Sequence, residues 1–251
     1  MIIEALTHLR TPAPRYVKKM GYLKEAIAIE ARIKRCQSAW QPHLDKCKSL
    51  ILEQAEKLPR DSQVMILGSG GFHDVPVKRL LDMGHHITCV DIVHLPKVKK
   101  RYPQVTFMER DVTGLNENLY NAVNKGVRVS PAETWGLIKT PDLIISLNLL
   151  SQLALKMVAN AESHENDLGV LFQENVLKAH VEWLQKQKTN VLLISDIARE
   201  YYEGDNLLES VPSLPKMDMP DPTETWKWNI APKGEADKNI SVLHQVGAWK
   251  M

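Results

Sequence analysis

Short apolar runs alternate with amphipathic segments from about residue 63 onward. Apolar runs of this length, bounded by polar and turn-forming residues, are typical of strands buried on both faces of a parallel sheet. Such runs predict strands over residues 64–67, 86–91, 105–108, 142–147 and 190–196. Helical periodicity separates them, in one helix that begins at Asp74 as N-cap and ends at Gly84, and in another over 168–187. Strands that alternate with helices predict an α/β fold, a doubly wound parallel sheet with helices on both faces.

The last 30 residues have a different period. Residues 224–230 and 240–249 alternate apolar and polar positions, and a polar segment with Pro232 and Gly234 joins them. Two alternating runs with no helix between them predict a β-hairpin. The sheet is therefore expected to end in two strands of opposite direction.

The first 60 residues show helical rather than strand periodicity. After a break at 11–14, they predict helices over 20–38 and 43–57, which Pro42 and Pro59 would end. We therefore expect an N-terminal helical extension over 1–60 and one α/β domain over 61–251. The extension holds 12 Lys and Arg against six Asp and Glu. A solvated helical surface is the favoured explanation of that excess, and a patch for an anionic substrate or RNA is the alternative.

Composition narrows the class of protein. The chain has 251 residues, of which 44% are hydrophobic and 25% charged, as in ordinary globular domains. It has no apolar run of 18 residues and no basic, apolar leader, so neither a membrane span nor a signal peptide is expected. Its three cysteines include no C-x-x-C pair, which predicts no metal site and no disulfide framework. A reducing, cytoplasmic location agrees best with this.

A glycine-rich turn follows the first predicted strand at Gly68-Ser69-Gly70-Gly71. Glycines let the backbone approach a ligand closely, and ligands bind parallel sheets at the carboxyl ends of the strands. Asp91 ends the second predicted strand, 21 residues beyond Gly70. A carboxylate there can accept hydrogen bonds from both hydroxyls of an adenosine ribose. The sixth position of the turn is His73 rather than Gly or Ala, which counts against a nicotinamide dinucleotide.

The ordered set of these motifs resembles the class I methyltransferases, the seven-stranded, Rossmann-like family that uses S-adenosylmethionine. The segments that match are Val64–Gly71, Cys89–Asp91, Met108–Val112, Pro141–Asn148 and the terminal hairpin. The resemblance covers about residues 60–251. It implies a seven-stranded, mostly parallel sheet of order 3-2-1-4-5-7-6, with strand 7 antiparallel, and S-adenosylmethionine as cofactor. Two positions depart from the family: Phe72 stands for its third glycine, and Ile66 for the acid before the glycine turn.

The resemblance also implies roles for individual residues. The backbone at Gly68, Ser69 and Gly70 would lie against the methionine part of the cofactor. Asp91 would hold the ribose and Ile92 would pack on the adenine. The remaining cofactor-binding residues would be Asp111, which accepts from the adenine amino group, Val112, whose amide donates to the ring, and Asn148, which faces the transferring methyl group. An ordinary loop acid before a Thr-Gly turn is the alternative for Asp111.

Polar residues after the fourth and fifth predicted strands are candidates for contact with a substrate, because both strands should end at the ligand edge. The catalytic candidates are Asn148, Asp196 and Tyr201, and the substrate-binding candidates are Ser151, Gln152, Arg199 and Tyr202. Rim packing is the alternative for the two tyrosines. Core or edge packing is the favoured explanation of three tryptophans on the terminal hairpin, Trp226, Trp228 and Trp249. The stacking of a planar substrate is the alternative. Residues 113–139 and 154–167 are candidate lids.

The leading hypothesis is thus an S-adenosylmethionine-dependent methyltransferase that acts on a small molecule or on an acceptor that the sequence does not identify. The N-P-P-Y motif of enzymes that methylate amino groups of DNA bases is absent, since the corresponding stretch is Asn148-Leu149-Leu150-Ser151. A nicotinamide-dependent oxidoreductase is one alternative. Another is a non-catalytic cofactor-binding or interaction module, in which Phe72 and Ile66 would mark loss of the site. Nucleic acid remains an alternative partner through the basic N-terminal helices, and the sequence does not indicate an oligomeric state.

Overall fold

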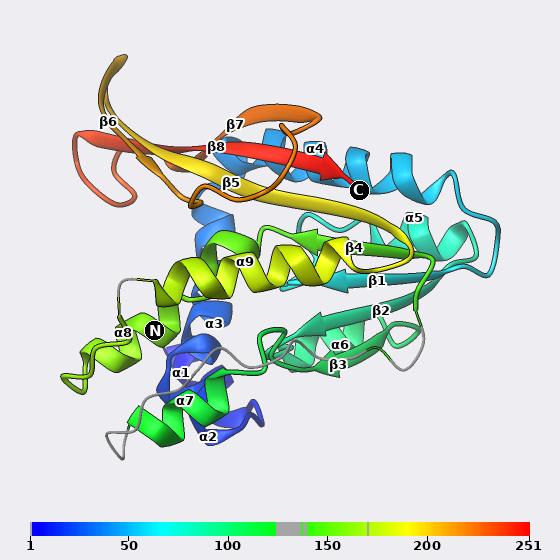
Figure 1. The fold of residues 1–251 in the computed structure, drawn as a ribbon, viewed down its shortest axis with the longest axis horizontal. Coiled ribbons are helices and arrows are strands. Elements are labelled where there is room, and N and C mark those ends of the chain that lie inside the picture. Colours follow the sequence, from blue (N-terminus) through cyan, green and yellow to red (C-terminus); the bar gives the residue numbers. More distant parts are fainter. Residues whose placement is uncertain (1, 124–136, 138–139, 170) are drawn as a thin grey trace.

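A mostly parallel β-sheet forms the centre of the protein in the computed structural model, which describes residues 2–123, 137, 140–169 and 171–251. Within these residues the sheet has eight strands in the order β3-β2-β1-β4-β5-β8-β7, and β6 pairs with β5 off this path (Figure 1). The strands are β1 (Gln63–Leu67), β2 (His86–Asp91), β3 (Thr106–Glu109), β4 (Leu143–Leu147), β5 (Asn190–Glu203), β6 (Asn206–Pro212), β7 (Glu224–Ala231) and β8 (Ile240–Lys250).

The strand order agrees with the order that the methyltransferase resemblance implies, with β7 and β8 in the places of that family's strands 6 and 7. The strands β1 to β5 are parallel, and β8 runs antiparallel to both β5 and β7. The terminal hairpin is therefore confirmed. The predicted number of seven strands was wrong, because β5 continues beyond Asp196 to Glu203 and the chain turns back through Gly204 into β6. Every residue of β6 is exposed, so this strand lacks the apolar alternation by which a sequence shows a strand.

Alternate residues of each strand pack against opposite layers of helices. Val64 and Ile66 of β1 share one hydrophobic cluster with α4 (Gln37–Ala55), α5 (Val77–Asp82) and α6 (Pro96–Arg101). Met65 and Leu67 share the other cluster with helices of the opposite face, which are α7 (Asn116–Val123), α8 (Leu155–Glu162) and α9 (Phe172–Gln185). Because side chains of a strand alternate between its two faces, this pattern produces the doubly wound, three-layered fold that the sequence predicts.

The N-terminal helices in the described part of the chain are α1 (Ile2–Arg10), α2 (Arg15–Lys19), α3 (Tyr22–Arg35) and α4. Of these, α2, α3 and α4 share the core of the sheet, whereas α1 packs against α3. Val17, Leu23 and Ile27 belong to the same cluster of buried residues as β1. Figure 1 shows α1, α2 and α3 at the left, on the side of the sheet where β1 ends. The domain boundary at residue 60 stays a prediction, because residues on its two sides pack into one core.

Two local predictions about helix ends were wrong. Pro42 lies inside α4, in its second turn, where the missing N–H removes only the bond to the carbonyl of Ser38. The buried side chains of Trp40 and Leu44 hold the helix on both sides of the proline. Asp74 is not an N-cap, because α5 begins at Val77 with Pro76 before it. The frayed start of α5 leaves the Asp74 carboxylate available to another element.

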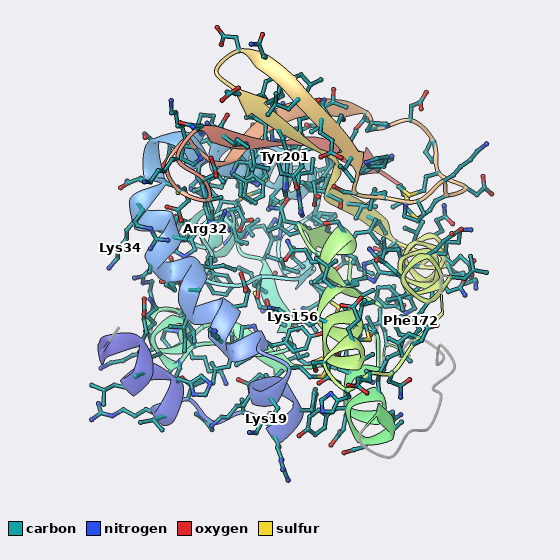
Figure 2. The ribbon with its side chains drawn as sticks, turned by 90° about the vertical axis from the view of Figure 1, so that its left-hand side faces the viewer. Lys19, Arg32, Lys34, Lys156, Phe172 and Tyr201 are labelled. Carbon is teal, nitrogen blue, oxygen red and sulfur yellow. The ribbon has the colours of Figure 1, made fainter. Side chains whose placement is uncertain are left out.

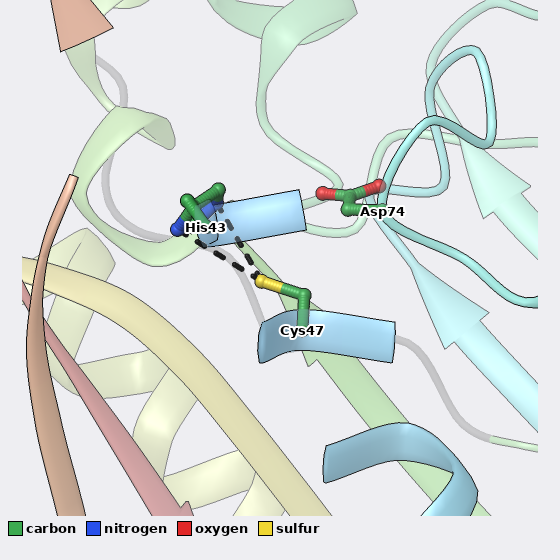
Figure 3. Close-up of side chains that lie close together, drawn as sticks. All are labelled: His43, Cys47 and Asp74. Atoms are coloured by element: carbon green, nitrogen blue, oxygen red, sulfur yellow. Dashed lines mark hydrogen bonds between the residues drawn. The ribbon is translucent and has the colours of Figure 1, made fainter. Parts of the chain in front are cut away.

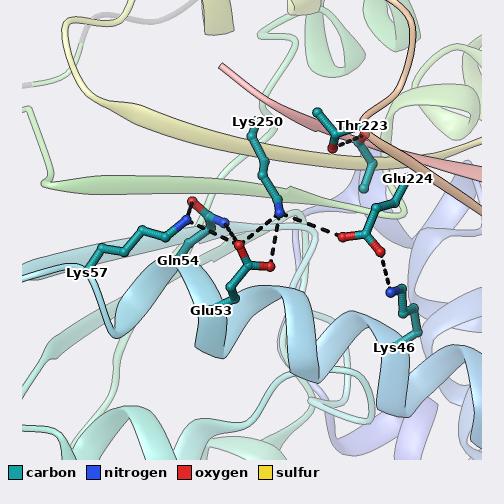
Figure 4. A network of polar contacts seen from close by, with 8 residues as sticks. Lys46, Glu53, Gln54, Lys57, Thr223, Glu224 and Lys250 are labelled. Atoms are coloured by element: carbon teal, nitrogen blue, oxygen red, sulfur yellow. Dashed lines mark hydrogen bonds and ion pairs between the residues drawn. The ribbon is translucent and has the colours of Figure 1, made fainter.

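A chain of ion pairs joins α4 to the last two strands (Figure 4). Lys250 of β8 pairs with Glu53 of α4 and with Glu224 of β7, and Glu224 also pairs with Lys46. Each of these pairs is partly exposed, so each is worth at most about 1 kcal/mol. The buried face of α4 contributes more to holding the helix on the sheet, since Cys47, Leu50, Ile51 and Ala55 lie in the core.

None of the helices in the described part of the chain is long and apolar enough to cross a membrane. All three cysteines lie in that part, as buried free thiols. The candidate lid over 113–139 falls largely outside the described residues, whereas most of the second, over 154–167, forms α8.

Candidate functional site

A cavity of about 570 Å³ opens where β1, β2 and β4 end. Figure 2 faces this edge of the sheet and shows α3 crossing in front of it, with Arg32 and, nearer the lower end, Lys156 of α8 beside it. One part of the cavity, the glycine-loop part, is lined by Gly68, Ser69, Gly70, Asp91, Ile92, Asp111 and Val112. The other, the aromatic part, is lined by Ile29, Ile33, Trp40, His43, Leu44, Trp228 and Ile230. Asp74 and Asn148 also line the cavity. The Asn148 side chain contacts both His43 and Asp74.

The glycine turn leaves its backbone open to the cavity. Gly68 has φ +78°, and a Cβ atom there would lie 2.8 Å from the carbonyl oxygen of Leu147. Only glycine therefore lets β1 and β4 approach this closely. Gly70 has φ +49°, and a Cβ atom there would meet nothing within 4 Å. Gly68 is thus required for packing, whereas Gly70 borders open space in which a ligand can lie.

The Asp91 carboxylate closes the glycine-loop part of the cavity. Its Oδ2 accepts from the Gly70 amide at 2.9 Å, and its Oδ1 accepts from the Ile92 amide at 2.8 Å. Burial raises the pKa of Asp91, and the bonds from the Gly70, Ile92 and Val93 amides oppose that shift. A carboxylate oxygen can accept more than one hydrogen bond. Each of the two Asp91 oxygens can therefore accept a further hydrogen bond, so that together they can accept from a pair of neighbouring hydroxyls.

Phe72 does not fill the crevice. Its backbone has φ +64°, and its side chain is buried in the core with its ring centroid 5.3 Å from Tyr102 and 5.8 Å from Phe107. The left-handed backbone that a glycine adopts easily is thus retained by a larger residue, whose ring is turned away from the cavity. Ile66 is fully buried in the same cluster.

The Asp111 carboxylate is bonded within its own loop. It accepts from the amide and the hydroxyl of Thr113, at 2.9 and 2.7 Å, and from the Asn116 amide at 2.8 Å. These bonds stabilise the Thr-Gly turn and the start of α7. The turn-forming explanation therefore accounts for Asp111 by itself, although Asp111 and Val112 both line the cavity.

Asn148 is fixed where β4 ends. Its backbone has φ +49°, its amide donates to the Ile194 carbonyl at 2.8 Å, and its carbonyl accepts from Gln152 Nε2 at 3.0 Å. Its side-chain amide lies 2.9 Å from Asp74 Oδ2 and 3.1 Å from His43 Nε2. A non-glycine residue held in a left-handed conformation by its surroundings is common at functional sites. Gln152 also lines the cavity.

The structure adds a cluster that the sequence did not reveal, formed by His43, Cys47, Asp74 and Asn148. Figure 3 shows the first three of these side chains. Burial lowers the pKa of His43 to about 3 and raises the pKa of Cys47 well above its usual value. Burial also raises the pKa of Asp74, and the hydrogen bond from Asn148 opposes that shift. The spacing of His43 and Cys47, one helical turn apart, was a usable signal.

His43, Cys47 and Asp74 place ligand atoms within 4.8 Å of one another, close enough to consider a metal ion. However, Trp226 Nε1 lies 3.1 Å from His43 Nδ1, where it donates a hydrogen bond. An indole nitrogen only donates, so this contact favours the tautomer with Nδ1 unprotonated and the proton on Nε2. A metal bound to Nε2 would reverse that assignment and bring two N–H groups together. The hydrogen bonds thus favour a proton-carrying cluster, and the expected lack of a metal site stays a prediction.

Five candidate residues do not line the cavity: Ser151, Asp196, Arg199, Tyr201 and Tyr202. Asp196 is buried within β5, accepts from the Ser151 hydroxyl and lies 3.6 Å from His244 Nδ1. The placement of the other three after the end of a strand was wrong, because β5 continues through them and pairs with both β6 and β8. Tyr201 accordingly lies in the upper part of Figure 2, on the strands.

Glu30 of α3 holds this helix against the glycine turn. It accepts from His73 Nε2 at 2.8 Å, just beyond the turn, and pairs with Lys97 of α6. Burial alone would raise the pKa of Glu30, but the hydrogen bonds and charges of His73 and Lys97 outweigh it and lower the pKa to about 2. These contacts fix one wall of the cavity.

We expect Glu30→Gln to lower the free energy of unfolding at pH 7 by on the order of 2 kcal/mol. Because the pKa of Glu30 is depressed in the folded protein, its contribution is complete above the ordinary value of 4.5 and is lost as the pH falls toward 2. Urea unfolding between pH 4.5 and 2 should accordingly show a flatter pH dependence in the variant. Identical slopes in the two proteins would contradict the assignment.

Comparison with known proteins gives likeness of fold only. No family model and no curated protein matches the chain. Among solved structures, a Burkholderia thailandensis 1,6-didemethyltoxoflavin N1-methyltransferase with bound S-adenosylhomocysteine is 12% identical, with 94% of this chain and 91% of that one covered and a TM-score of 0.43. Coclaurine N-methyltransferase is 14% identical, with 62% and 35% covered and a TM-score of 0.35. A protein assigned as a Zn-dependent alcohol dehydrogenase from Rhodobacter sphaeroides is 14% identical, with 57% and 44% covered and a TM-score of 0.30. The chain thus spans less than half the length of the latter two.

Proposed function

We propose that the protein is an S-adenosylmethionine-dependent methyltransferase that acts on a small-molecule acceptor in a cytoplasmic setting. The observation that carries the proposal is the Asp91 carboxylate, which lies in the cavity beside an open glycine turn with acceptor capacity to spare. A carboxylate at the end of the second strand of such a sheet is suited to the hydroxyls of a ribose.

The residues of the glycine-loop part fit an adenosine-containing cofactor. Gly70 leaves room for its backbone to approach the ligand, and Ile92 and Val112 offer apolar surface for a purine. The cavity volume of about 570 Å³ is in the range of ordinary small-molecule sites. In this proposal Asp91 holds the ribose, Gly68, Ser69 and Gly70 border the methionine part, and Asn148 lies toward the transferring methyl group.

When bound, the cofactor supplies an already activated sulfonium methyl group. The remaining work of the chain is to bind, to orient and to exclude water. The helix α3 covers the carboxyl edge of the sheet, and the aromatic part of the cavity offers an apolar surface next to Asn148. Holding two reactants in line in such a site lowers a barrier by up to about 7–11 kcal/mol.

A small molecule is favoured over nucleic acid as the methyl acceptor because several basic residues of the N-terminal helices already form ion pairs with glutamates of the same chain. Arg35 and Arg32 both pair with Glu235, and Lys46 pairs with Glu224. Such pairing leaves less positive charge for phosphate contacts. A salt-dependent shift of an RNA oligonucleotide on the protein would favour the nucleic-acid alternative.

Titration calorimetry with S-adenosylmethionine and with NADH tests the proposal. We expect micromolar binding of the first and none of the second. Binding of NADH alone would favour an oxidoreductase, and binding of neither would favour an interaction module. Methyl transfer from radiolabelled S-adenosylmethionine into a mixture of small metabolites would then identify the acceptor.

A further inference from the structure

We infer that the methyl acceptor is a flat ring without negative charge that bears an N–H or O–H group, and that its proton passes to the cluster of Asp74, Asn148 and His43. This inference rests on the proposed function, which it deepens by naming the substrate class and the proton acceptor. Three observations carry it: the shape of the aromatic part of the cavity, its lack of a free cation, and the hydrogen bonds of the cluster.

The aromatic part of the cavity has flat walls. The His43 and Trp228 rings stack with centroids 3.9 Å apart and 5° between their planes, and Trp40 meets the Trp228 ring edge-on at 5.3 Å. The aliphatic side chains of Ile29, Ile33 and Ile230 pack against Trp40 and line the same part. Flat aromatic walls favour a flat ligand, because aromatic rings gain most from stacked or edge-on contact.

The charges near this part disfavour an anionic ligand. Arg32 donates to the Ile230 carbonyl at 3.2 Å, pairs with Glu235 and lies over the Trp40 ring. Its charge is therefore already compensated by neighbouring groups. An anionic ligand would find no free cation among the described residues that line this part, and a buried unpaired charge is costly.

The hydrogen bonds of the cluster define two protonation states that differ by one proton. With Nε2 of His43 protonated, the tautomer that the Trp226 N–H favours, the Asn148 atom that faces it must be the amide oxygen. Asp74 lies 2.9 Å from that same atom and must then be protonated to donate to it. With Asp74 ionised, Asn148 instead presents its NH₂ group to both neighbours, and the His43 proton moves to Nδ1, against the Trp226 N–H. The ionised state is therefore strained and gains a hydrogen bond when it takes up a proton.

The surroundings of the cluster allow both states. Lys48 on α4 and His73 beside the glycine turn favour the ionised form of Asp74 electrostatically, while burial favours the neutral form. His244 on β8 and burial both disfavour a charged His43, and the Cys47 thiol on α4 lies 3.5 Å from its Nε2. Asp74 is thus the group that gains or loses the proton, and His43 stays neutral and changes its tautomer.

The proposed transfer balances as follows. The acceptor nitrogen or oxygen forms a bond to the methyl carbon, while the carbon–sulfur bond of the donor breaks and its electron pair stays on sulfur. The N–H or O–H bond of the acceptor breaks, its electron pair stays on the acceptor atom, and the proton goes to the ionised Asp74. Asn148 turns its oxygen inward to accept from the new Asp74 O–H. Proton acceptance of this kind contributes roughly 10²- to 10⁴-fold to a rate.

The test uses 2-naphthol, a flat probe with one O–H group, on protein saturated with S-adenosylhomocysteine and in excess over the probe. Excited 2-naphthol is a strong acid, and its anion emits at longer wavelength, so the emission ratio reports a nearby proton acceptor. We expect bound 2-naphthol to show anion emission in the wild-type protein. That ratio should fall at least about fivefold in Asp74→Asn. It should be unchanged in Asp82→Asn, which alters an exposed carboxylate on α5.

The outcomes separate this inference from the proposed function. Binding of S-adenosylhomocysteine, measured by calorimetry on each variant, shows that the fold and the cofactor site are intact. If the cofactor product binds but 2-naphthol does not, or if the emission ratio does not depend on Asp74, this inference fails and the proposed function stands. His43→Gln should reduce the ratio less than Asp74→Asn does. Stoichiometric binding of Zn²⁺ that Cys47→Ser abolishes would also overturn the inference.

Discussion

Replacing Asp91 by Ala is expected to weaken the binding of S-adenosylmethionine by about 100-fold or more. The substitution removes the proposed acceptor of two ribose hydroxyls, and hydrogen bonds to a charged group are worth about 1.5–3 kcal/mol each. It also releases the amides of Gly70 and Ile92, which the carboxylate holds at 2.9 and 2.8 Å. Titration calorimetry of the wild-type protein and the variant measures the loss.

Two further variants sharpen this prediction. Asp91→Asn keeps an oxygen acceptor without the charge, so it should lose less affinity than Asp91→Ala. Glu109→Gln alters the residue beside Asp91 on the neighbouring strand, where Glu109 pairs with Lys99 and does not line the cavity. It should leave affinity unchanged. Equal affinities of the wild-type protein and Asp91→Ala would show that the carboxylate does not hold the cofactor.

Replacing Gly68 by Ala is expected to lower the free energy of unfolding by about 2–4 kcal/mol. The backbone of Gly68 is left-handed, at φ +78°, where a side chain costs about 1–2 kcal/mol. The new Cβ atom would in addition lie 2.8 Å from the Leu147 carbonyl oxygen, which β4 cannot move without disturbing its pairing with β1. Urea unfolding followed by circular dichroism measures the change.

Gly70→Ala is the matched control for that substitution. Gly70 is also left-handed, at φ +49°, but no atom lies within 4 Å of the position of its Cβ. It should lose only about 1 kcal/mol of stability, the conformational cost by itself. Equal losses in the two variants would mean that the close approach of β1 and β4 contributes nothing.

The sequence predicted the parallel part of the sheet well because its strands are buried on both faces. The runs that form β1 and β4 are almost wholly apolar, so their existence and position followed from periodicity. It did not predict β6, whose residues are all exposed, and so it ended β5 too early. Side chains that contact only solvent and one neighbouring strand leave no periodic signal.

The residues of the candidate site also differ in whether the sequence could predict them. The glycine turn and Asp91 are close in sequence to strands that could be recognised, so their meeting at one edge could be predicted. The aromatic part could not be, because it joins α4 to the hairpin, and His43 and Trp228 are far apart in the chain. Asp74 was interpreted as a helix cap because its contact, Asn148, depends on tertiary packing. Phe72 departs from the family pattern without blocking the cavity, since its ring packs into the core.

A crystal structure of the protein with S-adenosylhomocysteine tests the central claim most directly, because it shows where the adenosine lies. The account predicts both ribose hydroxyls on the Asp91 carboxylate, with the methionine part along Gly68–Gly70 and the sulfur directed toward Asn148. A ligand bound elsewhere, or one whose ribose does not touch Asp91, would contradict it.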